Sequence, residues 1–107
     1  MSSSKNKYDA LEQIIFEGGL RIVGVHCYKS LDMIVFVLNN AKIIQKKLSA
    51  SERLVSVTNA KELDNFQLLG GGVGVHWPAV DEDISLKGLL KDEIVSPFGN
   101  ISFAMAA

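Results

Sequence analysis

Apolar residues in the first half of the chain follow the pattern of an antiparallel β-meander. Three runs are rich in β-branched and other apolar residues, and they cover Leu20–Tyr28, Leu31–Leu38 and Lys42–Leu48. Runs of this kind, bounded by polar breaks, favour strands. The pair Lys29-Ser30 predicts a tight turn after the first run. The pair Asn39-Asn40 predicts a second turn, because Asn tolerates the positive φ of short hairpins.

From Met33 to Leu38 the middle run is apolar at every position, unlike a strand with one solvated side. Its odd positions from Met33 to Val37 would point to one side of the sheet, and its even positions from Ile34 to Leu38 to the other. An antiparallel strand with one side in water alternates apolar with polar residues. We therefore expect both sides to be covered. The cover is either a second subunit or small partner protein, or the N-terminal helix and the C-terminal tail.

The spacing of polar cap residues predicts short helices around the meander. Asp9 followed by Glu12 has the spacing of a capping box, and Gly18-Gly19 ends a helix expected over residues 10–17. The same spacing recurs at Ser49 with Glu52 and at residues 59 and 62. It predicts one helical turn through residues 54–55 and another leading to residues 63–66.

The last third of the chain combines extended segments with one more helix. Residues 66–69 and 73–77 are expected to be extended on either side of three consecutive glycines. Asp83 is a suitable N-cap for a helix that runs to Leu90 and buries its leucines. Beyond Ile94 the chain is apolar, and residues 96–100 predict a turn before a last strand at residues 101–105.

These elements predict one domain of the α+β class. A chain of 107 residues with 48% apolar and 21% charged residues has the composition of a globular domain. We expect a small antiparallel sheet, made of the three-stranded meander plus further strands, with short helices packed on it in two layers. The domain is expected to span residues 8–107, after a disordered tail at residues 1–7.

Charge and cysteine content limit the expected partners and compartment. Eleven basic and 12 acidic residues give a net charge of −1, so no nucleic-acid or anionic membrane partner is expected. The polar start of the chain and the lack of a run of about 20 apolar residues indicate neither a signal peptide nor a membrane span. The chain has a single cysteine, Cys27, which fits a reducing compartment, so we expect a cytoplasmic protein. We expect the Cys27 side chain to be a small buried hydrophobe.

The segment from Gly70 to Gly74 holds four of the chain's nine glycines but lacks the marks of a phosphate-binding loop. A P-loop needs a Lys followed by Ser or Thr, and a dinucleotide fingerprint needs a helix after its glycines. Here the strand-like run from Val73 to Trp77 follows instead. The glycines therefore predict a bulge or a corner with positive φ.

Two interpretations stay open for the residues that follow the glycines. His76 with Asp81 and Asp83 has the residue types of a metal or acid–base site. The same carboxylates could instead cap the next helix, with His76 bonded to one of them or to the backbone. Trp77, next to Pro78 at a strand end, either closes the core or forms a binding hot spot.

Three segments together resemble the domain-of-unknown-function family 2442. They are residues 65–70, 72–78 and 81–90, within a similarity that extends over about residues 20–90. The resemblance implies a hairpin meander, a short helical stretch and a glycine–His–Trp–acidic ending that leads into a helix. This chain departs from the family pattern at Asn40-Ala41, where the family has a Gly-containing turn, and at Ser51–Leu54, where only the last two residues match. The family has no assigned activity. Some members are fused to a helix-turn-helix segment or encoded beside another small domain.

Two classes of function follow. The first is a non-enzymatic protein-interaction or regulatory module that self-associates or pairs with a small partner protein. This class fits the doubly apolar middle strand and the lack of a complete catalytic constellation. The alternative is a small enzyme, or a ligand- or metal-binding protein, that uses His76, Asp81 and Asp83. No cofactor and no resident metal are expected.

Overall fold

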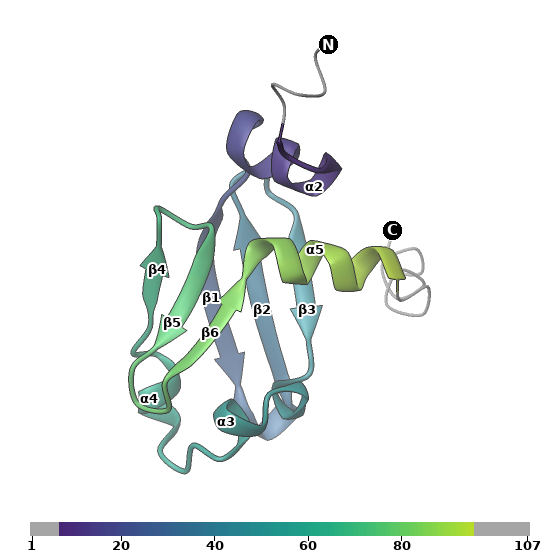
Figure 1. Cartoon of the computed structure of the whole chain (residues 1–107). Coiled ribbons are helices and arrows are strands. Elements are labelled where there is room, and N and C mark those ends of the chain that lie inside the picture. The colour runs from purple at the N-terminus through teal and green to yellow at the C-terminus, as the bar shows by residue number, and fades with distance from the viewer. Residues whose placement is uncertain (1–6, 96–107) are drawn as a thin grey trace.

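The computed structural model describes residues 7–95, which form an α+β fold with two three-stranded antiparallel sheets (Figure 1). The expected fold class is confirmed, and the further strands form a sheet of their own. Residues 1–6 of the tail predicted at residues 1–7 lie outside the described residues, as do the turn and strand predicted at residues 96–105. None of the described helices is long and apolar enough to cross a membrane.

The predicted meander forms the first sheet, sheet A, in the order β1-β2-β3. Its strands are β1 (Ile22–Tyr28), β2 (Met33–Leu38) and β3 (Ile43–Lys46). Val25, Phe36 and Ile44 lie in register across all three strands and are buried, which fixes the inner side of the sheet. The outward positions of β2 are Met33, Val35 and Val37, and these are only partly buried.

The predicted turn at Lys29-Ser30 is present, but it is longer than two residues. Lys29–Leu31 is a short 3₁₀ helix, η2, and Asp32 follows it with a left-handed φ of 49°. The Asp32 carboxylate stabilises this conformation because it accepts the Ser49 backbone N–H at 2.7 Å and the Ser49 hydroxyl at 2.6 Å. Both hydrogen bonds favour the ionised carboxylate, and they lower the pKa of Asp32. The second strand therefore begins two residues later than expected.

The second sheet, sheet B, follows the helical stretch and has the order β4-β5-β6. It contains β4 (Gln67–Leu69), β5 (Gly74–Trp77) and β6 (Glu82–Ser85). Val75 and Trp77 of β5 point inward and are fully buried, whereas His76 points to the opposite side. The extended segments predicted on both sides of the glycines are confirmed.

Two short helices connect the sheets, and both carry a side-chain cap. Helix α3 (Glu52–Val55) follows a 3₁₀ turn, η3 (Leu48–Ala50), and its cap is Ser51 rather than the expected Ser49. Ser51 accepts the Leu54 amide, whereas Ser49 binds Asp32. Helix α4 (Ala60–Leu63) begins at Asn59, as the sequence predicts.

The N-terminal helix of the described chain meets the start of its last helix near one end of the sheets. Helix α2 (Ala10–Glu12) continues into a π-helical turn, η1 (Gln13–Glu17), and the predicted capping box at Asp9 is present. Helix α5 (Leu86–Val95) runs beside it. Lys87 joins the two helices, with its Nζ 2.8 Å from the Asp9 carboxylate and 3.1 Å from that of Glu12. This ion pairing raises the pKa of Lys87 and lowers that of Asp9, whereas the pKa of Glu12 is lowered first by the Asp9 backbone amide and then by Lys87.

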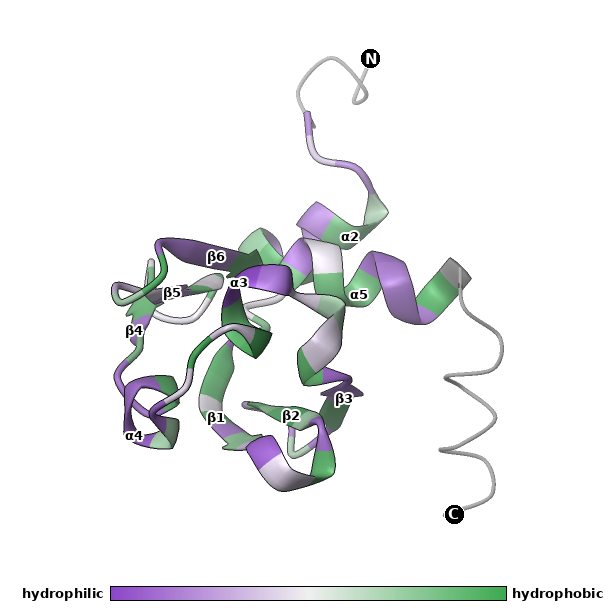
Figure 2. Ribbon diagram, turned by 90° about the horizontal axis from the view of Figure 1, so that it is seen from below, coloured by the Kyte–Doolittle hydropathy of each residue, from purple (hydrophilic) through white to green (hydrophobic). Residues whose placement is uncertain are grey.

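One hydrophobic core lies between the sheets and under α5. Its largest fully buried side chains include Trp77, Phe36, Ile15 and Leu86, which come from β5, β2, η1 and α5. Helices α3 and α5 lie over the same side of sheet A, and α2 lies beyond the strand ends (Figures 1 and 2). The other side of sheet A faces away from every described helix.

Candidate functional site

The three glycines between β4 and β5 join the two sheets. Gly70, Gly71 and Gly72 all have positive φ, at 55°, 73° and 124°. The Gly72 carbonyl accepts the Ile22 amide at 2.8 Å, so the corner contacts the first strand of sheet A. The predicted positive-φ corner is thus present. Its role in the fold is to bring the backbone of β1 against that of the glycine loop.

His76 and Asp83 lie side by side on sheet B. They occupy paired positions of β5 and β6, and His76 Nδ1 is 2.5 Å from Asp83 Oδ1. The imidazole side chain is 25% exposed and the carboxylate 66% exposed, so the pair lies on the solvent side of the sheet. Such a pair can hold one imidazole tautomer and exchange protons with solvent.

The expected role of Asp83 as a helix N-cap is wrong. Asp83 belongs to β6, and α5 begins three residues later at Leu86. The Ser85 hydroxyl accepts the Gly88 amide at 2.9 Å and takes the capping role instead. The physical reason is cross-strand pairing, since residues 82–85 are already committed to hydrogen bonds with β5.

Asp81 is not part of the His76–Asp83 pair. It lies in the turn between β5 and β6, with a left-handed φ of 52°. Its backbone carbonyl accepts a hydrogen bond from Arg53 Nη1 at 2.6 Å, which ties the turn to α3. Within residues 7–95 no three His, Cys, Asp or Glu side chains are grouped to hold a metal ion.

Trp77 is a core residue in this structure. Its side chain is 1% exposed, and its indole N–H donates to the Leu63 carbonyl at 3.0 Å. The Phe66 ring lies 6.3 Å away between centroids. The indole therefore fixes the helical stretch at α4 against sheet B, and its surface is unavailable as a binding hot spot.

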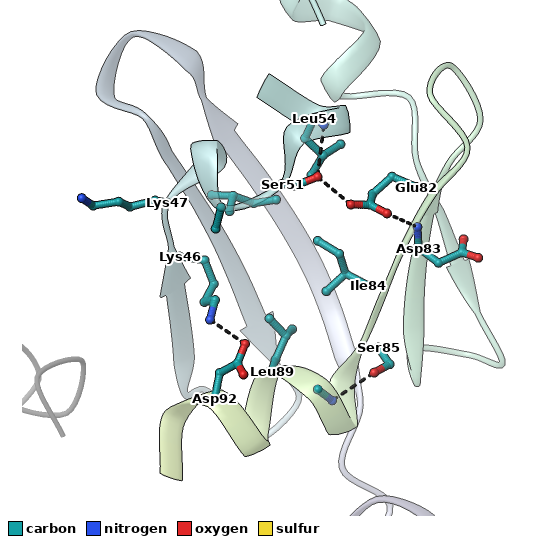
Figure 3. A pocket seen from close by; sticks show the side chains of 13 residues that line it. Lys46, Lys47, Ser51, Leu54, Glu82, Asp83, Ile84, Ser85, Leu89 and Asp92 are labelled. Carbon is teal, nitrogen blue, oxygen red and sulfur yellow. Dashed lines mark hydrogen bonds and ion pairs between the residues drawn. The ribbon is translucent and has the colours of Figure 1, made fainter. Parts of the chain in front are cut away.

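A cavity of about 250 Å³ lies between β3 and β6, in a region that the sequence did not indicate (Figure 3). Helix α5 borders it on one side, and η3 with α3 on the other. Its floor is apolar and includes Ile34, Leu54, Ile84 and Leu89, and its rim is polar. No signal in the sequence could reveal it, because its walls come from six separate elements.

Two hydrogen-bonded pairs lie at the rim of the cavity. Lys46 Nζ is 2.9 Å from the Asp92 carboxylate, and the Ser51 hydroxyl donates to Glu82 at 2.6 Å. Lys47 and the Asp83 carboxylate point away from the cavity (Figure 3). Asp83 is among the lining residues but His76 is not, so the imidazole of the His76–Asp83 pair does not line the cavity.

The comparison with known proteins places the chain among uncharacterised proteins. The profile of a family described as "Protein of unknown function (DUF2442)" matches residues 30–95, which is more than half of the chain. The chain belongs to the DUF2442 family. The resemblance inferred from the glycine–His–Trp segment is thereby confirmed. No functionally curated protein matches this DUF2442 chain.

Two solved structures are similar to this DUF2442 protein. A protein of unknown function from Rhodospirillum rubrum is 25% identical, with a TM-score of 0.56 over 67% of this chain and 86% of that one. An uncharacterised protein from Chromobacterium violaceum is 23% identical, with a TM-score of 0.60 over 80% of this chain and 81% of that one. Both support the fold, and neither brings an activity.

Cys27 is expected to react slowly with electrophiles. Its thiol is half-buried and lies 3.9 Å from the Leu63 carbonyl. Burial, with a smaller contribution from Asp64, raises its pKa from 9.0 to about 11. The thiolate is the reactive form, so near pH 8 iodoacetamide should label Cys27 about a hundredfold more slowly than in the unfolded chain. Mass spectrometry with and without urea measures both rates, and equal rates would contradict the raised pKa.

Proposed function

We propose that this DUF2442 protein is a cytoplasmic, non-enzymatic protein-interaction module that self-associates through the outer face of sheet A. The outer face consists of the outward positions of β1, β2 and β3. They are Val23, Gly24, His26, Tyr28, Met33, Val35, Val37, Ile43 and Gln45. The observation that carries the proposal is that this apolar face has no cover among residues 7–95.

The outer face is continuous across the three strands. Val37 lies between Gly24 and Ile43, and Val35 lies between His26 and Gln45 in the next row. Val23, Tyr28 and Ile43 are 55%, 44% and 48% exposed. Scattered single apolar residues need no explanation, but a contiguous patch on a sheet is typical of an interface. In Figure 2 the green central strand shows the same apolar character.

The described helices do not supply the cover. Helices α3 and α5 pack on the inner side of sheet A, and α2 lies beyond the ends of its strands (Figures 1 and 2). The sequence left open whether the N-terminal helix covers the second side. Because α2 lies beyond the strand ends, it does not cover the outer face. The remaining candidates for the cover are the C-terminal tail and another chain.

A second copy of this chain is the occupant that the face fits best. None of its outward positions, all within the described residues, carries a Lys, Arg, Asp or Glu. Two copies can therefore meet about a two-fold axis without like-charge repulsion, as an isologous interface requires. Charge complementarity usually provides the specificity of contacts between different proteins, and this face offers none.

Introducing a charge on the outer face is expected to abolish self-association. Ile43→Lys places an ammonium at a position that is 48% exposed, and burying it against a second copy without a partner is costly. We expect size-exclusion chromatography with light scattering to give twice the 11.7 kDa chain mass for the wild type and a single chain mass for the variant.

Val55→Lys is the matched control, because Val55 is 44% exposed but lies on α3, away from the outer face. This variant should keep the wild-type mass. A monomeric wild type at micromolar concentration would overturn the proposal and leave cover by the chain's own C-terminal residues. Loss of association in both variants would also contradict a contact specific to this face.

A further inference from the structure

The cavity between β3 and β6 borders the edge of a strand and not its face. Neighbouring strand residues point to opposite sides of a sheet, so a cavity over one face would touch only alternate residues. Here four consecutive residues of β6, Glu82 to Ser85, line the same cavity. β6 is the last strand of sheet B, and its second edge has no strand partner among the described residues.

The backbone groups at this edge can be assigned from the ladder. The Leu86 amide donates to the Val73 carbonyl at 2.9 Å on the side of β5. Because antiparallel strands alternate the direction of their amides, those of Ile84 and Glu82 also face β5. The amides of Asp83 and Ser85 therefore face the cavity. The Asp83 amide bonds there to Glu82 Oε1 at 3.1 Å.

Glu82 thus occupies the place of a neighbouring strand. One oxygen of its carboxylate accepts the Asp83 amide, and the other accepts the Ser51 hydroxyl (Figure 3). A side chain can rotate away from these bonds, whereas a paired strand cannot. The arrangement protects an open sheet edge in the way that charged side chains commonly do. It also leaves the backbone amides of this edge available to a hydrogen-bond acceptor that binds them better than Glu82.

We infer that this cleft binds an extended peptide of a partner protein, which adds to β6 as a fourth strand of sheet B. Peptide carbonyl and amide groups would pair with Asp83 and Ser85, and an apolar side chain would enter the cavity above Ile84 and Leu89. Of the charged side chains that line the cavity and do not point away from it, two are carboxylates, Glu82 and Asp92, and one is a lysine, Lys46 (Figure 3). The segment recognised is therefore one that alternates apolar with basic residues. This site is distinct from the outer face of sheet A.

An NMR titration tests the inference on the full chain. The probe is the acetylated and amidated pentapeptide Lys-Val-Lys-Val-Lys, added to ¹⁵N-labelled protein up to millimolar concentration. We expect saturable amide shifts at Asp83 and Ser85 that exceed those on the outer face of sheet A. The same peptide N-methylated at all five residues has methyl groups on both strand edges and cannot pair as a strand, and the peptide with Glu in place of Lys has the wrong charge. Both should give no such shifts.

Asp92→Asn tests the charge contribution without touching the backbone. Asp92 is exposed at the rim, so its loss should weaken binding of the Lys-containing peptide by about two- to fivefold. Glu62→Gln on α4 is the matched control and should leave the affinity unchanged. The inference is overturned if Asp83 and Ser85 do not shift. Equal shifts with the N-methylated peptide would overturn it as well, since the edge would then be protected by Glu82 and not used for binding.

Discussion

Gly72→Ala is expected to cost at least about 4 kcal/mol of folding free energy, which is an exceptional loss for one methyl group. Gly72 has a φ of 124°, a conformation open essentially to glycine alone. An added Cβ would lie 2.3 Å from the Ile22 carbonyl oxygen and 3.0 Å from the Ile22 nitrogen. Both are backbone atoms, so the clash is relieved only by separating β1 from the glycine corner.

The neighbouring glycine is the matched control for this substitution. Gly71 also has a positive φ, 73°, but a Cβ there would meet no atom within 4 Å. Gly71→Ala should therefore cost only the conformational penalty of a left-handed residue, about 1–2 kcal/mol. Urea denaturation followed by circular dichroism measures both losses. Equal losses would show that the contact between Gly72 and Ile22 is unimportant for the fold.

The elements that depend on local signals were predicted from the sequence. The meander follows from three apolar runs, and the Asn59 cap and the Asp9 capping box act over two and three residues. The positive-φ corner follows from three successive glycines, since no other residue type adopts that geometry freely. In each of these cases the residues that determine the structure are neighbours in the chain.

The errors arose where distant residues decide the structure. In residues 82–85 the inward Glu82 and Ile84 alternate with the outward residues 83 and 85. Four residues are too few for this alternation to distinguish a strand from the start of a helix. Only pairing with β5 makes them a strand. Likewise, Asp32 adopts its left-handed conformation with the help of Ser49, which is 17 residues away.

The candidate site shows the same division between features set by neighbouring residues and features set by distant ones. The sequence brought His76 and the carboxylates together as a group, but the two acids separate because Asp83 is in β6 and Asp81 is in the turn before it. The cavity between β3 and β6 was missed altogether. Its position depends on how two sheets and α5 pack, and neither periodicity nor spacing contains that information.

Trp77→Ala is expected to destabilise the domain by about 3–5 kcal/mol, because it empties the largest buried side-chain site in the described core. Trp77→Phe separates the two contributions of the indole. It keeps most of the apolar contact with Phe66 but removes the indole donor to the Leu63 carbonyl, an oxygen that the weak Cys27 thiol also contacts. A loss of about 1–3 kcal/mol is expected for this variant.

Phe16→Ala provides the matched control, since Phe16 is an aromatic residue that is 47% exposed on η1. It should change the free energy of unfolding by no more than about 0.5 kcal/mol. Trp77 is the only tryptophan in the chain, so circular dichroism and not fluorescence must follow unfolding. If Trp77→Ala were no worse than Phe16→Ala, the indole would not hold α4 against sheet B. Trp77 would then become free again to serve as a binding residue.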